Sequence, residues 1–537
     1  MTFPAFDPDH WPPEMPARFN MAAYCLARAA RDRAHHPALI IHANLIDEQP
    51  AEVWTFAELE DAVLRAADAL QDFGAQHKIP QGARVLIRLE NTSAYAILYF
   101  AVIAAGFVAV AASNQLTAHE ADFLVRDSGA AIVALADGLP RGDSLAGTLV
   151  ITEADVRAML KHARRADYAD TRPDDPAYLI YTSGTTASPK GVVHAHRVAL
   201  GRSPTYQGWY GITPDDRMLH AGAFNWTYTL GTGLIDPWAN GVTSIVYTGD
   251  KRADIWAPLI VKTRATLFAA VPSLFRQILK YAPPGPLNLG DLRHGLIAGE
   301  SPPPALFDDW TARTGTGLYE ALGMSEISTY VSTGPSTPRK PGTTGKPQPG
   351  RRVAILPVSE GETPLPTGEE GLLAVHRSDP GLMLGYWNRP DEQNEVMRGE
   401  WFLGGDTGMI DEDGYVTHLG RANDIMKALG YRVAPLEVET VLALHPSVAE
   451  VACSEVRVRA DVSVIGAFVV LKPGFAPDSE GIMAFAAERL ARYKCPREVA
   501  FVPALPRTAN GKVRRPDLQG LLERTKNEAA GQAPGAA

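Results

Sequence analysis

The sequence predicts an α/β protein: a large N-terminal domain of parallel sheets flanked by helices, with a β-rich subdomain, followed by a small α+β domain. Three observations support this prediction. Strand-like and helix-like runs alternate over roughly the first four hundred residues, a pattern typical of parallel sheets covered by helices. Short strands with Gly and Pro turns follow between Gly342 and Gly420, and a new mixture of helices and strands then begins.

The length of 537 residues exceeds what one hydrophobic core can hold, so several domain-sized units are expected. We predict an N-terminal domain over residues 1–420, with the β-rich subdomain at about 342–420, and a C-terminal domain over residues 421–526. Residues 527–537 are rich in Ala, Gly and Gln, which predicts a disordered tail.

Composition and charge exclude several classes of protein. The formal net charge of -10 argues against a surface for nucleic acid or anionic membranes. Cys25, Cys453 and Cys495 stand far apart, which indicates a reducing compartment and neither a zinc site nor a disulfide framework. The first residues are acidic and proline-rich, unlike a signal peptide. We therefore expect a cytoplasmic protein.

One uncharged stretch, Ala94 to Ala112, is long enough to span a bilayer. Its pattern instead predicts a helix to about Ala105, a break at Gly106 and a strand at Phe107 to Val110, after an earlier strand at Val85 to Arg88. Buried βαβ units need such continuous apolar runs, so we predict no membrane span.

The remaining elements are predicted from the same signals. The segment Ser273 to Lys280 has helical spacing, with Ser273 as its cap. Short apolar or β-branched runs predict strands at Tyr178 to Tyr181, Thr243 to Tyr247, Leu267 to Ala270, His294 to Ala298, Gly371 to His376 and Gly414 to Gly420. The C-terminal domain should hold helices at about Leu436 to Ala443 and Ser479 to Leu490, and strands at Val448 to Val456, Val464 to Leu471 and near Val499.

The loop YTSGTTASPKG, Tyr181 to Gly191, follows a strand and precedes a helix-like run at 192–202. It fails the nucleoside-triphosphatase template G-x-x-x-x-G-K-[ST], because Pro189 replaces the second glycine and Gly191 replaces the final hydroxyl. Backbone N–H groups, the Thr and Ser hydroxyls and Lys190 would still form an anion-binding concavity. A plain surface turn is the alternative for such a stretch taken alone.

Further motifs follow this loop in a fixed order: AGE (298–300), LGMSE (322–326), GTTGKPQPG (342–350), GYWNRP (385–390), GDTG (405–408), GRANDIMKALGYRVAP (420–435) and PRTANGKVRR (506–515). With this set the sequence resembles the AMP-forming adenylating superfamily of acyl-CoA synthetases, aryl-CoA ligases, luciferases and peptide-synthetase adenylation domains. It looks most similar to benzoate-type and medium-chain acyl-CoA ligases. The motifs span about residues 178–515, and the N-terminal part fits by its fold pattern.

The resemblance implies an ATP-dependent carboxylate–CoA ligase with two half-reactions. A carboxylate attacks the α-phosphate of ATP to give an acyl-adenylate and pyrophosphate, and the thiol of coenzyme A then displaces AMP. Because two anions must meet, the site needs cations and aimed donors. By the resemblance, Lys512 bridges the carboxylate and the α-phosphate, Glu326 holds Mg²⁺, and Ser325 touches the α-phosphate.

The remaining nucleotide contacts come from the same motifs. By the resemblance, Asp406 accepts hydrogen bonds from the ribose hydroxyls and Arg421 reaches the ribose or a phosphate. The full expected set for ATP and AMP is Thr182, Ser183, Gly184, Thr185, Thr186, Lys190, Gly299, Glu300, Gly323, Met324, Asp406 and Arg421. Thr182 and Lys190 would hold the leaving pyrophosphate. As single residues, Glu326 could instead begin a helix and Asp406 could form a turn.

The second half-reaction points to coenzyme A as a free cosubstrate, because no carrier-protein domain follows. The expected coenzyme A contacts are Leu429, Gly430, Tyr431 and Arg432. The C-terminal domain is expected to be mobile about a hinge at Asn423, where the family usually has Asp or Lys; Asn tolerates unusual backbone angles. The family often has a tyrosine where this chain has Leu322, so stacking on adenine is lost. The sequence leaves open whether the protein forms a homodimer.

The acyl pocket is expected between two glycines and an aromatic loop. Its residues are Phe224, Asn225, Trp226, Gly299 and Gly323, with Tyr228 as a further wall. Each of the three aromatic side chains could instead be a plain core residue. Acetate-specific relatives block the pocket with a tryptophan near LGMSE, and none is present here. We therefore expect an aromatic, alicyclic or short-to-medium-chain acid larger than acetate, in fatty acid or aromatic acid metabolism.

Two alternatives remain beside the ligase. A luciferase-like or other acyl-adenylate-forming enzyme would share the first half-reaction but would not use coenzyme A. A non-catalytic nucleotide-binding scaffold would be expected to have lost Lys190, Glu326, Asp406 or Lys512, and all four are present.

Overall fold

The computed structural model describes the chain from residue 4 to residue 524 with several short gaps. The described residues are 4–140, 142–145, 148–182, 189–424, 426–428, 431–459, 462–490, 492, 494–507, 513–522 and 524. Only the backbone is described for 423, 427–428, 431–432, 459 and 462.

The first of two large sheets in the N-terminal domain has seven strands. Its strand order is β18-β8-β7-β4-β3-β5-β6, with parallel pairing from β7 to β6 and antiparallel pairing of β8 with β7 and β18. The bounds are β3 Arg84–Arg88, β4 Val108–Ala111, β5 Ile132–Leu135, β6 Leu149–Thr152, β7 Pro176–Thr182, β8 Lys190–Ala195 and β18 Gly385–Tyr386.

A nine-stranded sheet lies beside it, in the order β15-β14-β13-β12-β11-β9-β10-β1-β2. Its central strands from β1 to β13 are parallel, and the two ends are antiparallel. The bounds are β1 Pro37–His42, β2 Glu52–Thr55, β9 Arg217–His220, β10 Thr243–Tyr247, β11 Leu267–Ala270, β12 His294–Ala298, β13 Gly317–Met324, β14 Ser328–Ser332 and β15 Lys346–Pro347.

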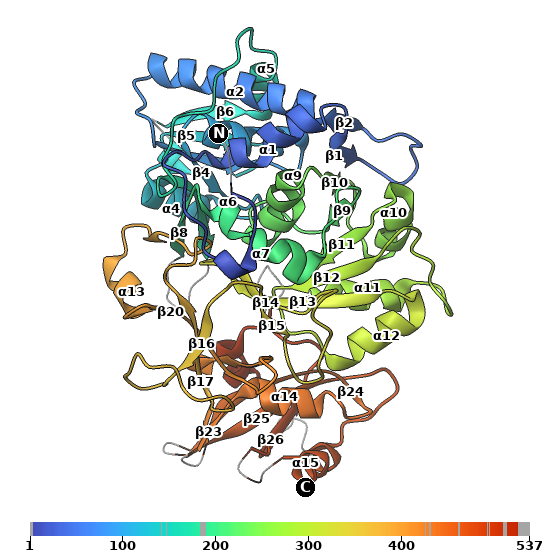
Figure 1. The fold of residues 1–537 in the computed structure, drawn as a ribbon. Helices are drawn as coiled ribbons and strands as arrows, with labels where there is room; N and C mark the ends of the chain where they lie inside the picture. The colour runs from blue at the N-terminus through green and yellow to red at the C-terminus, as the bar shows by residue number, and fades with distance from the viewer. Residues whose placement is uncertain are drawn as a thin grey trace.

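Helices cover both sheets and separate them (Figure 1). They are α1 Met21–Asp32, α2 Phe56–Gln76, α3 Ser93–Ala104, α4 Ala118–Ser128, α5 Glu153–Met159, α6 Val198–Gly201, α7 Ser203–Thr205, α8 Thr227–Leu230, α9 Asp236–Ala239, α10 Trp256–Thr263, α11 Pro272–Tyr281, α12 Pro304–Thr314 and α13 Pro390–Glu395. The segments Tyr206–Tyr210 and Gly231–Ile235 are π-helical. Helix α3 is buried on every side, which explains its uncharged sequence.

The prediction for the Ala94–Ala112 stretch is confirmed, because a buried helix, α3, leads into strand β4. Among the described residues, every helix is too short or too polar to cross a bilayer. Three N-terminal capping boxes, at Thr55, Thr117 and Thr152, fix where α2, α4 and α5 begin.

The β-rich subdomain is a five-stranded sheet, as predicted. Its order is β16-β17-β20-β19, with β21 paired to β20. The bounds are β16 Val353–Leu356, β17 Gly371–His376, β19 Met397–Arg398, β20 Trp401–Ile410 and β21 Val416–Arg421. Strand β18, from the same part of the chain, pairs instead with β8 of the seven-stranded sheet, so GYWNRP is brought beside the phosphate-loop hairpin.

The C-terminal domain holds the predicted mixture of helices and strands around its own core. Its elements are β22 Met426–Ala428, β23 Tyr431–Val433, α14 Pro435–Leu442, β24 Val448–Arg459, β25 Val462–Leu471, α15 Ser479–Ala487 and β26 Glu498–Phe501. Figure 1 shows this domain, in orange and red, at one end of the molecule. The side chain of Arg276 in α11 lies 3.6 Å from that of Glu450 in β24.

Two predictions are wrong. The run at 192–202 is not helix-like throughout: its first part completes β8, antiparallel to β7, and helix α6 begins at Val198. The phosphate loop therefore joins two strands of a hairpin. Ser273 does not cap α11, because Val271 holds the cap position and Pro272 begins the helix.

Candidate active site

The hairpin of β7 and β8 carries the phosphate loop. Thr182 and Lys190 face each other across its open end as Cα partners, so the two predicted pyrophosphate contacts are adjacent. Ser183, Gly184, Thr185 and Thr186 lie outside the described residues. The opening of the hairpin therefore places a hydroxyl and an ammonium group together, as an anion site requires.

Tyr386 joins this hairpin to the predicted magnesium ligand. The Lys190 ammonium lies 5.3 Å from the centre of the Tyr386 ring, and the Tyr386 hydroxyl donates a hydrogen bond of 2.8 Å to Glu326 Oε1. Pairing of Tyr386 with Val192 in β8 holds the ring there. One aromatic side chain thus links a cation and a carboxylate that lie 136 positions apart in the sequence.

Ser325 and Glu326 lie in the three-residue turn between β13 and β14, with Met324 and Ser328 as the closing pair. The backbone around them is held from two sides. His194 Nε2 donates to the Ser325 carbonyl at 2.8 Å, and the Met383 amide donates to the Glu326 carbonyl at 2.8 Å. The turn is thus anchored to β8 and to the segment before β18.

Asp127, near the end of α4, fixes both flanks of the hairpin. Its carboxylate accepts hydrogen bonds from Tyr181 at 2.7 Å and from Arg389 at 3.0 Å, and its carbonyl accepts one from the Trp387 indole at 2.9 Å. Sequence reasoning quoted GYWNRP but assigned no role to Tyr386, and it missed Asp127. No local signal marks an aspartate whose partner stands 260 residues away.

The nucleoside side of the site is built on β20 and β21. Asp406 is 3% exposed and lies opposite Arg421 in the sheet. Its Oδ1 lies 3.1 Å from Arg421 Nε and 3.2 Å from His418 Nε2. Met324 packs so closely over Gly404 that a side chain at this glycine would collide with it. The LGMSE motif therefore contacts the residue that directly precedes GDTG.

The acyl side is built around Gly299 and Trp226. Gly299, after β12, has φ +95°, and a Cβ there would lie 2.6 Å from the Trp226 ring. Trp226 meets Tyr228 edge-on at 5.4 Å. Tyr228 is buried and donates to the Leu296 carbonyl at 2.9 Å, so its hydroxyl serves the core. Trp226 and Gly299, two of the expected pocket residues, thus lie directly against each other.

The other predicted pocket and adenine residues are distributed around this contact. Phe224 is 2% exposed and packs on Tyr95 at 5.3 Å, which places its ring in the core. Asn225 and Glu300 are half-buried beside Trp226 and Gly299 in the chain. Gly323 packs against the Ser328 carbonyl, where a Cβ would collide.

Several predictions fall outside what the structure describes. Lys512, Leu429 and Gly430 are not among the described residues, and the side chains of Asn423, Tyr431 and Arg432 are not described either. The described residues that flank Lys512 are defined: Arg507 and Val513 form an antiparallel bridge, and Arg507 donates to Glu450 at 2.6 Å.

We expect the protein to lose stability as the pH falls below about 6.5, because four buried histidines are held neutral. Burial lowers the pKa to about 3 for His194 and His220 and to about 4 for His196 and His294. A lowered folded-state pKa means that the unfolded chain binds protons first, so acid favours unfolding. Each histidine contributes about 1.4 kcal/mol per pH unit over this window.

Thermal unfolding measured across this pH range tests the expectation. Tm should fall steeply as the pH drops below about 6. His294→Gln is the matched variant, because an amide can replace the Nε2 donor to the Tyr210 carbonyl. The unfolding free energy of this variant should fall less steeply with decreasing pH, because unfolding takes up about one proton fewer. A Tm that stays constant down to pH of about 5 would contradict the burial argument.

The geometry assembles one site from four features: a cation at a hairpin opening, a carboxylate on a turn, a carboxylate beside an arginine, and an aromatic wall over a glycine. Such a site can bind a polyphosphate through Lys190, a sugar through Asp406, and an apolar body beside Trp226.

Comparison with known proteins agrees with this arrangement. The AMP-binding enzyme family matches residues 26–387, and the AMP-binding enzyme C-terminal domain matches residues 437–512. The chain is 32% identical to the uncharacterized acyl–CoA ligase YtcI of Bacillus subtilis (strain 168), over 88% of this chain and 92% of the relative. It is 29% identical to the 3-hydroxybenzoate–CoA ligase of Aromatoleum sp. (strain CIB), over 94% and 99%. The crystal structure of the anthranilate CoA ligase AuaEII with anthranoyl-AMP has a TM-score of 0.84 at 26% identity, covering 98% of this chain and 100% of that chain.

Proposed function

Since the chain belongs to the AMP-binding enzyme family and is an AMP-forming acid–CoA ligase, we propose that its substrate is an aromatic acid. The enzyme joins a carboxylate to ATP as an acyl-adenylate with release of pyrophosphate, and then forms the acyl-CoA with release of AMP. Alicyclic and short-to-medium-chain acids larger than acetate are the competing substrates.

The contact between Trp226 and Gly299 carries the proposal for an aromatic acid. A flat indole beside a glycine with no side chain leaves a wall on which a ring can pack. The relative from Aromatoleum is named for 3-hydroxybenzoate, and the solved neighbour holds anthranoyl-AMP. Both names agree with a ring-shaped acyl group.

For the nucleotide, we assign each role to the group that faces the matching charge. Lys190 and Thr182 hold the leaving pyrophosphate, together with the loop residues between them. Asp406 binds the ribose hydroxyls, while Arg421 neutralises it and reaches the nucleotide. Gly299, Glu300, Gly323 and Met324 border the adenine. Ser325 contacts the α-phosphate, and Lys512 neutralises charge where the carboxylate and the phosphate meet.

Mg²⁺ fits the donor set of the turn between β13 and β14. One Glu326 oxygen already accepts a hydrogen bond from Tyr386, which orients the carboxylate. Magnesium is usually held by one or two carboxylates plus substrate phosphates, and Glu326 supplies such a carboxylate beside the proposed phosphate site. When bound, the ion neutralises charge on the phosphates during adenylation. Coenzyme A is assigned to the segment Leu429 to Arg432, with Asn423 as the hinge residue.

Pyrophosphate release, measured with and without coenzyme A, tests the function and the acid together. The panel is acetate, butyrate, octanoate, cyclohexanecarboxylate, benzoate, 3-hydroxybenzoate and anthranilate. We expect release with the ring-shaped aromatic acids, and acyl-CoA only when coenzyme A is present. Preference for octanoate over every benzoate would refute the aromatic proposal. AMP release with oxygen uptake and no need for coenzyme A would favour the luciferase-like alternative.

Gly299→Ala is expected to raise the KM for the aromatic acid by roughly tenfold to a hundredfold. The new methyl would lie 2.6 Å from the Trp226 ring, and overpacking of this kind costs about 1–3 kcal/mol. Gly285→Ala is the matched control, because Gly285 has nearly the same φ, +94°, and an added Cβ meets nothing within 4 Å. Equal KM values in the two variants would show that Trp226 does not border the acid.

A further inference from the structure

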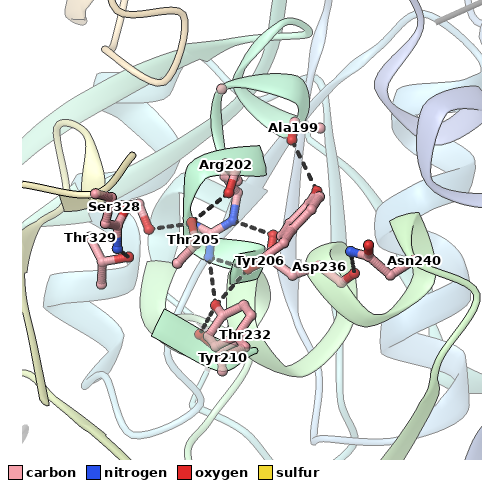
Figure 2. Close-up of polar contacts among 12 residues, drawn as sticks. Ala199, Arg202, Thr205, Tyr206, Tyr210, Thr232, Asp236, Asn240, Ser328 and Thr329 are labelled. Carbon is pink, nitrogen blue, oxygen red and sulfur yellow. Dashed lines mark hydrogen bonds and ion pairs between the residues drawn. The ribbon is translucent and has the colours of Figure 1, made fainter. Parts of the chain in front are cut away.

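A buried ion pair lies beneath the turn that carries Ser325 and Glu326. Arg202, just after α6, and Asp236, at the start of α9, are 1% and 0% exposed. Arg202 Nε donates to Asp236 Oδ1 at 2.7 Å and Nη2 donates to Oδ2 at 2.6 Å, so the pair is bidentate. Figure 2 shows both side chains among the labelled residues Thr205, Tyr206, Tyr210 and Thr232.

The surroundings fix the orientation of the guanidinium. Tyr210 donates to Asp236 Oδ2 at 2.7 Å and shares a hydrogen bond of 2.9 Å with the Thr232 hydroxyl (Figure 2). Gly231 makes room for the pair, because a side chain at this position would collide with Arg202. The Asp236 carboxylate accepts hydrogen bonds from Arg202 and Tyr210. The remaining guanidinium nitrogen of Arg202, Nη1, can therefore donate to another acceptor.

That acceptor is the hydroxyl of Ser328, to which Arg202 Nη1 donates (Figure 2). Ser328 closes the turn opposite Met324. Its backbone has φ +71°, in the left-handed region that residues other than glycine rarely adopt. Such a conformation persists only where the surroundings hold it in place. The contact with Arg202 is an interaction that can do so.

The next residue of β14 is held by a second buried pair. Gln348 donates to the Thr329 hydroxyl at 3.3 Å and accepts from Arg351 Nε at 3.1 Å. Arg351 in turn pairs with Asp379 at 2.7 Å, and both side chains are nearly inaccessible. Two buried arginines therefore fix consecutive residues directly after the turn.

Stability alone is a poor reason for this arrangement. Removing two charges from water costs most of what their attraction returns, and well-packed apolar residues of similar volume often stabilise a core as much. A buried charged network does, however, hold its partners in one geometry. The Arg202 nitrogen that Asp236 does not use donates to Ser328. The buried pair therefore contributes a fixed conformation of the turn between β13 and β14.

We propose that Arg202 is a positioning residue for the metal–phosphate turn: its buried pair with Asp236 holds Ser328 in the left-handed conformation and so sets where Ser325 and Glu326 point. The inference rests on the proposed role of Glu326 toward Mg²⁺. Arg202 touches no substrate in this account and acts through Ser328 alone.

Ser328→Ala and Ser328→Gly test the proposal without disturbing the buried pair. Both remove the hydroxyl, but only glycine adopts a positive φ without cost. We expect both variants to need about tenfold to a hundredfold more free Mg²⁺ for half-maximal pyrophosphate release, the loss expected for one hydrogen bond to a charged group. The KM for the acid should not change. Ser328→Ala should have the lower Tm of the two.

Ser332→Ala is the matched control, since Ser332 is a buried serine of the same strand whose hydroxyl donates to the Gly208 carbonyl at 2.9 Å. It should leave the Mg²⁺ requirement unchanged, whatever happens to its Tm. If the Ser328 variants match Ser332→Ala in Mg²⁺ requirement, the positioning role is refuted. Failure of the proposed function gives a different result, because the unmodified enzyme would then release no pyrophosphate with any acid of the panel.

Discussion

Lys512→Ala is expected to slow acyl-adenylate formation by roughly a hundredfold or more, the usual effect of removing one donor that meets charge in the transition state. A carboxylate and a triphosphate repel each other, so their reaction needs a cation between them. Lys512 stands in PRTANGKVRR, which matches the family motif for this cation. The segment is anchored at its described ends, where Arg507 bonds Glu450 and bridges Val513.

The two half-reactions separate this role from a general loss of folding. Pyrophosphate release with acid and Mg·ATP should collapse, whereas acyl-CoA formation from a supplied acyl-adenylate and coenzyme A should survive. Lys472→Ala is the control, since Lys472 is an exposed lysine of the same domain. Equal loss in both half-reactions would assign Lys512 to the structure of the domain and not to adenylation.

Much of the fold could be predicted because its core strands are short apolar runs that end at turn residues. The predicted strands at Thr243 to Tyr247, Leu267 to Ala270 and His294 to Ala298 have the bounds found in the structure. Each is buried along its whole length, so local hydrophobicity carries the signal. The helix break at Gly106 is also a local signal, because this glycine has φ +80° directly after the end of α3.

The part that failed depends on distant partners. The run at 192–202 was given helical character, but its first residues pair on one side with β7 and on the other with β18, almost two hundred positions later. Pairing with β18 cannot be read from residues 192–195 themselves. Serine favours the cap position, which predicts a cap at Ser273, yet proline is better suited to the first helical position, so the helix begins at Pro272 with Val271 as its cap.

The site shows the same division. The order of the motifs predicts roles for Lys190, Glu326 and Asp406, but it does not predict the side chains that contact them. Tyr386 stands 60 positions from Glu326 and Asp127 stands 262 from Arg389. Arg202 and Asp236 are 34 positions apart, and no motif in the sequence connects them. Only the packing of two sheets and the subdomain brings them together.

Glu326→Gln is expected to reduce pyrophosphate release by about a hundredfold, because it removes the charge that would hold Mg²⁺ on the phosphates. The substitution is close to isosteric, and the amide oxygen can still accept the Tyr386 hydrogen bond. The fold around the turn should therefore persist, and Tm should change little. The measurement is pyrophosphate release as a function of free Mg²⁺ at saturating ATP and acid.

Tyr386→Phe separates the effect of the Glu326 charge on pyrophosphate release from the effect of the orientation of its carboxylate. Phenylalanine keeps the ring that faces Lys190 at 5.3 Å but loses the donor to Glu326. Since one hydrogen bond to a charged group is worth about 1.5–3 kcal/mol, the phenylalanine variant should lose about tenfold to a hundredfold and recover part of this at high Mg²⁺. Glu326→Gln should not recover. Two results would contradict the metal role of Glu326: full recovery of Glu326→Gln with added Mg²⁺, or pyrophosphate release by this variant equal to that of the unmodified enzyme at every Mg²⁺ concentration. The Glu326 carboxylate would then not be the metal ligand, and Tyr386 would orient it for another purpose.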